Sequence, residues 1–190
     1  MPVIDYNASW MTYNSFLALI AVLLGFLVFK VNGKFLKLII GLLWFIFLPN
    51  TIYIFTDLEH FIVQWQEVSP TFKYLLLLQY VIFELIGIFT FLLALFPLER
   101  VINITKFFKK RKIQSLIVFN FLVAFGMVLG RVERLNSWDI FFNPHGVITS
   151  AKNVIFSADL LGLTVLFGLL CNFIYFLFRD KLLSVIKKFY

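Results

Sequence analysis

The sequence lacks most of what keeps a protein soluble in water. Only 14% of its 190 residues are charged and 62% are apolar, whereas soluble domains have about 25% charged and about 45–50% apolar residues. A single cysteine excludes a disulfide framework. The net charge of +7 accompanies 26 Phe and little polar surface, so we expect no nucleic-acid partner. What remains is a protein whose main partner is the lipid bilayer.

Five apolar stretches are long enough to cross a bilayer, which takes about 20 residues in a helix. We place them at residues 9–29, 38–55, 74–96, 113–129 and 154–178. The alternating pattern of a transmembrane barrel is absent, and open strands cannot satisfy their backbone in lipid. The predicted fold class is therefore all-α, a polytopic membrane helical bundle that forms a single domain over residues 1–190.

The basic residues predict which way the chain crosses the membrane. The loops after the first and third spans and the segment after the fifth hold 13 of the 17 Lys and Arg, and the other loops hold 4. By the positive-inside rule, the N-terminus lies outside and the C-terminus lies in the cytoplasm. The abundance of Phe, Ile and Lys indicates a bacterial source, so the expected location is the bacterial cytoplasmic membrane.

A first polar stretch interrupts the second span near its predicted outer end. Residues 48–60 read LPNTIYIFTDLEH. Pro49 removes a helical hydrogen bond, so the helix either kinks there or breaks into a half-helix facing a cavity, and we favour the kink. The spacing of Asn50, Tyr53 and Asp57 predicts one helical face, which His60 continues.

Glu84 lies near the centre of the third span. A carboxyl at the bilayer centre costs about 2.5–3.5 kcal/mol on insertion scales, so it must face the bundle interior. Tyr80, one turn earlier, is placed to donate a hydrogen bond to it. Glu84 is then either a proton-relay or ligand-binding group or a protonated packing residue, and we favour the functional interpretation.

A second polar stretch begins where the fourth span ends. Residues 130–139 read GRVERLNSWD. Arg131 and Arg134 stand one turn apart, where they could hold a phosphate between two guanidinium groups or pair with nearby acids. We predict that Asp57 lies within salt-bridge reach of one of them. Asp159 is expected about five residues inside the outer end of the fifth span.

The sequence predicts no metal or cofactor. Only two histidines are present, which excludes a three-His zinc site, and a mixed site around Asp57 and His60 is a weak alternative. The Gly-x-Ser-x-Gly turn of many hydrolases is absent. Whether the protein is an enzyme is left open.

The two polar stretches resemble a known family. Residues 48–60 are similar to the LPNxxYxxTDLxH motif of the bacterial domain-of-unknown-function family 1361, and residues 130–139 to its GRxxRxNSWD motif. The resemblance implies a multi-pass bacterial membrane protein and gives no reaction. It points to Pro49, Asn50, Tyr53, Thr56, Asp57, His60, Arg131, Arg134, Asn136, Ser137, Trp138 and Asp139.

We therefore expect a bundle with a polar, outward-facing site in the outer leaflet, which binds an anionic lipid headgroup or a small envelope metabolite. One alternative is a secondary transporter or ion-conducting protein, with Glu84 and Asp159 on the ion path. Another is an accessory membrane subunit with no catalytic role. The ligand-binding candidates are Asn50, Tyr53, Thr56, Asp57, His60, Glu84, Arg131, Arg134, Asn136, Ser137, Trp138, Asp139 and Asp159.

Overall fold

A computed structural model describes residues 2–186, and every regular element within that range is helical. Five helical stretches are long and apolar enough to cross a membrane. This confirms the all-α class and the five spans, while the sidedness of the termini stays a prediction. The stretches are Val3–Lys30, Lys34–Glu67, Pro70–Ile104, Lys112–Arg131 and Ala158–Leu182.

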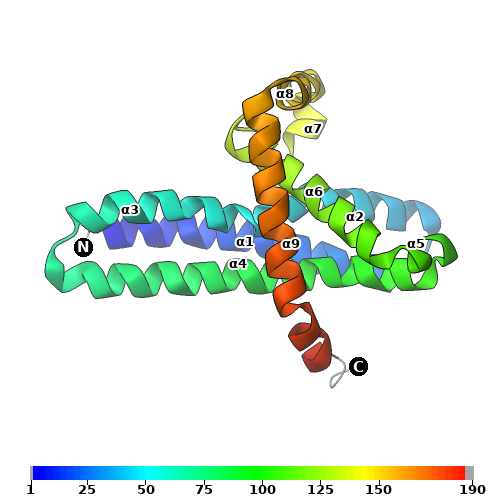
Figure 1. Ribbon diagram of the computed structural model, residues 1–190, viewed down its shortest axis with the longest axis horizontal. Coiled ribbons are helices and arrows are strands. Elements are labelled where there is room, and N and C mark those ends of the chain that lie inside the picture. The colour runs from blue at the N-terminus through cyan, green and yellow to red at the C-terminus, as the bar shows by residue number, and fades with distance from the viewer. Residues whose placement is uncertain (1, 187–190) are drawn as a thin grey trace. The chain divides into compact units, whose positions relative to one another are not determined.

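The chain packs as two compact units, Met1–Ala94 and Leu95–Tyr190. The boundary falls within helix α4 (Pro70–Ile104), which is labelled in Figure 1. The prediction of a single domain stays a prediction.

The first unit begins with a long helix, α1 (Pro2–Lys30), that folds back onto α2 (Lys34–Phe47). Asp5 in the first turn of α1 and Lys30 in its last turn match the helix dipole. Gly33, with φ 102°, makes the turn between the two helices in a conformation that L side chains rarely adopt. Ala18 and Ala21 of α1 are fully buried.

The second span continues past Pro49 as 3-10 helix. After α2 come two 3-10 segments, η1 (Leu48–Thr51) and η2 (Tyr53–Asp57), and then α3 (Leu58–Glu67). The amides of Ile52 and Phe55 donate to the carbonyls of Pro49 and Ile52, both at 3.1 Å. Ile52 keeps a right-handed helical backbone. The α-helix is therefore replaced over these residues by two tighter, hydrogen-bonded 3-10 turns, and the favoured kink stays a prediction.

Helix α4 contacts the rest of the first unit closely at two points. The buried Trp44 indole donates to the Ala94 carbonyl at 2.9 Å. Gly87 allows the 3-10 region to approach closely, because a Cβ there would lie 2.9 Å from the Cβ of Ile54.

The second unit pairs two long helices, α6 (Lys112–Arg131) and α9 (Ala158–Ile186). The ring of Phe121 lies where a Cβ on Gly168 would be, which brings the helices close together. Asn120 donates to Asn172 at 3.0 Å across the same pair. Shorter helices complete the unit: α5 (Lys106–Lys110), α7 (Asp139–Phe142) and α8 (Pro144–Phe156).

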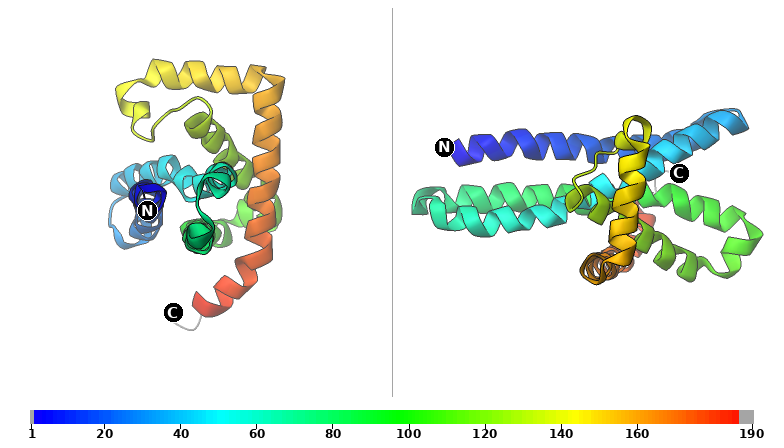
Figure 2. Two further views of the ribbon diagram at one scale, coloured as in Figure 1. Left: turned by 90° about the vertical axis from the view of Figure 1, so that its left-hand side faces the viewer. Right: turned by 90° about the horizontal axis from the view of Figure 1, so that it is seen from above.

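The fifth span begins later than predicted. Residues 154–156 are apolar but belong to α8, which lies crosswise to α9 (Figure 2). Ser157 takes an extended backbone, φ −92° and ψ 119°, and its hydroxyl accepts from the Leu160 amide at 3.4 Å. Asp159 is therefore an exposed residue in the first turn of α9. Our placement of it five residues inside the span is wrong.

Candidate functional site

Side-chain amides join three helices of the first unit. Asn7 of α1 is fully buried and exchanges two hydrogen bonds with Gln64 of α3, at 2.7 and 3.0 Å. It also donates to Gln79 of α4 at 3.3 Å and accepts from the Trp10 indole at 3.0 Å. Sequence reasoning missed this network because its members are spread over three segments. The spacing of Asn7, Trp10 and Asn14 along one face of α1 was the available signal.

Tyr80 belongs to this network and not to Glu84. Its hydroxyl donates to the Gln64 side-chain oxygen at 3.2 Å, so the hydrogen bond predicted from helical spacing alone is wrong. The Tyr80 hydroxyl therefore bonds to Gln64 on another helix and not to Glu84, the residue four positions later on its own helix. Phe61 packs against the Tyr80 ring with centroids 5.1 Å apart, and Phe83 against Trp10 at 5.3 Å. The hydrogen-bonded amides are thus bordered by aromatic rings.

Asp57 is the buried acid of the 3-10 region. It closes η2 and is only 2% exposed. The Asn14 side-chain amide of α1 donates to its Oδ2 at 3.3 Å. Asp57 also lies close enough to act electrostatically on Tyr80 and Glu84. Two acids therefore share one region of the first unit.

Glu84 is the other acid, and its environment is unusual. Both carboxylate oxygens are buried, and neither has a hydrogen-bond partner among the described residues. A buried ionised carboxylate without a partner is very unfavourable. Such a group either carries a proton or meets a cation. The prediction that Glu84 avoids the lipid is consistent with its buried oxygens.

Of the other polar candidate residues of the first motif, two bond to backbone carbonyls, one is half-buried and one is exposed. The Asn50 side chain donates to the Phe47 carbonyl at 2.8 Å, and the Thr56 hydroxyl donates to the Tyr53 carbonyl at 2.6 Å. These bonds satisfy backbone groups where the helix tightens. Tyr53 is half-buried. His60 is exposed, and its ring lies edge-on to Trp10 at 5.9 Å.

The second motif forms a loop in the second unit, after the end of α6. The Asn136 backbone amide donates to Asp139 Oδ2 at 2.7 Å, and the Asn136 side chain reaches the same oxygen at 3.4 Å. Asp139 therefore holds its own loop together. Ser137 is half-buried and Trp138 is 37% exposed.

The two arginines of this motif differ in backbone and exposure. Arg131 is half-buried in the last turn of α6. Arg134 is exposed and has φ 57°, a left-handed conformation that costs a non-glycine residue about 1–2 kcal/mol. Because Asp57 belongs to the first unit and both arginines to the second, the predicted ion pair between them stays a prediction.

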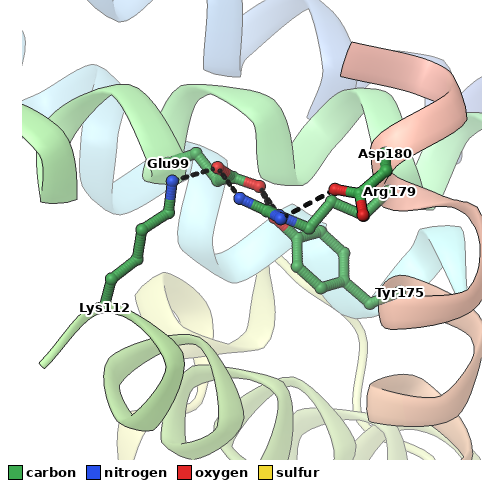
Figure 3. A network of polar contacts seen from close by, with 5 residues as sticks. All are labelled: Glu99, Lys112, Tyr175, Arg179 and Asp180. Atoms are coloured by element: carbon green, nitrogen blue, oxygen red, sulfur yellow. Dashed lines mark hydrogen bonds and ion pairs between the residues drawn. The ribbon is translucent and has the colours of Figure 1, made fainter. Parts of the chain in front are cut away.

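The second unit contains an acid that the sequence did not indicate, and both of its carboxylate oxygens are hydrogen-bonded. Glu99 accepts hydrogen bonds from the Tyr175 hydroxyl and the Arg179 Nε. Arg179 Nη2 and Lys112 Nζ reach its other oxygen, each at 2.8 Å (Figure 3). Arg179 also contacts Asp180 at 2.9 Å. The cluster ties α4, α6 and α9 together.

Glu99 is an acid that helical spacing alone did not indicate. Its side chain is only 4% exposed and both of its oxygens are hydrogen-bonded. Tyr175 and Arg179 lie four residues apart on one face of α9. That spacing was the signal that could have indicated an acid partner.

Metal ligands do not gather in the part of the chain that the structure describes. Within residues 2–186, no group of three His, Cys, Asp or Glu side chains is placed to hold a metal ion. The acidic region of the first unit offers two carboxylates and side-chain amides. These oxygen donors suit a proton or a hard cation better than zinc or copper, which favour sulfur and imidazole ligands.

Comparisons with known proteins give a family and no activity. A family model described as "Protein of unknown function (DUF1361)" matches residues 13–174, which is most of the chain. The comparisons with curated proteins and with solved structures found no match. The chain therefore belongs to this family of proteins of unknown function, as its two motifs predicted.

Proposed function

We propose that the first unit binds a proton or a monovalent cation at Asp57 and Glu84, and that the protein is a secondary transporter or ion-conducting protein. The observation that carries this proposal is the Glu84 carboxylate, buried without a hydrogen-bond partner among the described residues. Acids inside membrane spans commonly mark ion pathways and proton relays. Glu84 lies in such a span.

The neighbours of Glu84 support a positive ligand over a negative one. Asp57 is a second acid that acts on it electrostatically, and Asn14 orients Asp57 through a hydrogen bond. Two acids repel an anionic headgroup and attract a cation. The adjoining 3-10 segments place Asp57 at an irregular stretch of backbone, where a span can adjust more easily than in a regular helix.

Reconstituted protein tests the proposal. Proteoliposomes that hold a pH-sensitive dye report proton movement under an imposed potential, and thermal unfolding in detergent reports Na⁺ binding as a shift in Tm. We expect the wild type to respond in at least one assay. Glu84→Gln should fold normally and respond in neither. Glu59→Gln, which neutralises an exposed acid of α3 in the same unit, is the matched control and should behave as wild type.

Two results would overturn the proposal. One is a wild-type protein that neither moves protons nor gains stability from Na⁺ relative to choline chloride. That outcome favours the accessory-subunit interpretation. The other is a Glu84→Gln protein with unchanged responses.

A second candidate function is favoured by the backbone of Arg134. Strained backbone conformations cluster at active sites and ligand clamps, and a second arginine, Arg131, precedes Arg134 by three residues in the chain. We propose that this loop binds an anionic lipid headgroup or a small phosphorylated envelope metabolite on the predicted outer side.

Glycerol phosphate is the probe for this loop, measured by titration calorimetry. Arg134→Gly relieves the left-handed backbone while removing the charge, so we expect a more stable protein with about tenfold weaker binding. Unchanged binding in Arg134→Gly, or no binding by the wild type, would contradict the second candidate.

A further inference from the structure

The second unit contains an open groove that the candidate sites do not use. It lies among the end of α4, α5 and the first half of α6, with a volume of about 520 Å³, within the range of about 300–1,000 Å³ typical of ligand sites. Its apolar lining comes from Leu98, Val101, Ile102, Phe108, Val118 and Leu122.

Along α6, the residues that line the groove change from polar to apolar. Arg111, Gln114 and Ser115 line it at the α5–α6 turn, and Val118 and Leu122 line it further along the helix. The spacing of residues 111, 115, 118 and 122 follows one helical face. The polar and basic groups of the groove thus lie toward the α5–α6 turn, within an otherwise apolar lining, which suits an amphiphile.

The polar end carries charge of one sign. Lys106, Lys109, Lys110 and Arg111 are exposed around the turn, and the sequence holds no acidic residue from Arg100 to Val132. Lys112 points to Glu99 instead, with its Nζ 2.8 Å from Glu99 Oε2 (Figure 3). Basic residues therefore outnumber acidic ones in this part of the sequence.

We infer that this groove binds an anionic phospholipid. One acyl chain lies against Val118 and Leu122, and the phosphate meets Arg111 and the lysines of α5. Basic pockets next to spanning helices on the cytoplasmic side suit acidic headgroups, and the charge distribution predicts that this turn is cytoplasmic. A guanidinium can bind phosphate through two parallel hydrogen bonds.

Native mass spectrometry of the full chain tests this inference, with phosphatidylglycerol and phosphatidylcholine as probes. We expect the wild type to retain phosphatidylglycerol preferentially. Arg111→Gln should weaken that binding about tenfold, the loss of one charge-assisted contact. Val118→Trp, which fills the apolar part of the groove, should weaken binding of the same lipid without affecting the fold.

Two matched control variants distinguish a specific lipid site from general attraction of lipid to the basic and apolar surface of the protein. Lys152→Gln removes an exposed cation on α8, and Val165→Trp enlarges an exposed apolar residue of α9. Both should bind phosphatidylglycerol as the wild type does. Equal retention of the two lipids would overturn the inference. So would a Val118→Trp protein with unchanged phosphatidylglycerol binding, because it would leave only diffuse attraction to the basic turn.

Discussion

Helix α4 buries two glutamates in opposite ways. Glu99 receives hydrogen bonds from three side chains, two of them positively charged. Glu84 receives none from the described residues. On one helix, the carboxylate in the second unit is therefore fully hydrogen-bonded, whereas the carboxylate in the first unit has no hydrogen-bond partner among the described residues.

The difference separates a structural acid from one available to a ligand. An acid whose oxygens are already engaged gains little from a proton or an ion, and removing it leaves its partners unmatched. An acid without a partner contributes little to folding and gains from any proton or cation that reaches it.

Loss of the Glu99 charge should have the largest effect. Glu99→Gln leaves Arg179 and Lys112 without their shared partner, and breaking a buried ion pair typically costs about 3–5 kcal/mol. Because these two side chains are still 21% and 27% exposed, we expect about 3 kcal/mol. Unfolding of the protein in mixed micelles measures it. Asp180→Asn, at an exposed contact of Arg179, should cost no more than about 1 kcal/mol.

Loss of the Asn14 amide should have the next largest effect. Asn14→Ala removes a hydrogen bond to the buried Asp57, and bonds to charged groups contribute about 1.5–3 kcal/mol. Thr12→Ala, at an exposed position of the same helix, is the control. If both variants unfold alike, Asn14 does not orient Asp57.

Gly87→Ala tests the close approach between α4 and the 3-10 region. The added methyl group would lie 2.9 Å from Ile54, and such overpacking costs about 1–3 kcal/mol. Gly41→Ala meets no atom within 4 Å and should be neutral or slightly stabilising. A Gly87→Ala protein as stable as Gly41→Ala would mean that the spans are further apart.

Loss of the Glu84 charge should have the smallest effect on folding. Because Glu84 has no hydrogen bond to lose among the described residues, Glu84→Gln should change the free energy of unfolding by less than about 1 kcal/mol. The same denaturation series measures it beside Glu99→Gln. A loss as large as that of Glu99→Gln would show that Glu84 has a structural partner and would remove the contrast.

The sequence predicted the spans well because membrane thickness and backbone hydrogen bonding leave few alternatives. It also predicted the interruption at Pro49, whose missing amide hydrogen acts locally. The start of the fifth span was wrong because residues 154–156 are as apolar as a span. Only the backbone at Ser157 separates them from α9.

The site was harder to predict because its contacts join distant segments. Asn7 and Gln64 are 57 residues apart, and Glu99 and Arg179 are 80 residues apart. Helical spacing identifies residues that share a face but does not reveal the partner helix. For the same reason helical spacing pairs Tyr80 with Glu84, its neighbour on α4, although its acceptor lies on α3.

Infrared spectroscopy of the reconstituted protein tests the contrast between the two glutamates most directly. Spectra recorded across pH and Na⁺ concentration report carboxyl groups that hold a proton or respond to a cation. We expect one such carboxyl band in the wild type, its loss in Glu84→Gln and its persistence in Glu99→Gln. A band that survives in Glu84→Gln, or that disappears only in Glu99→Gln, would contradict the assignment of Glu84 as the ligand-binding acid.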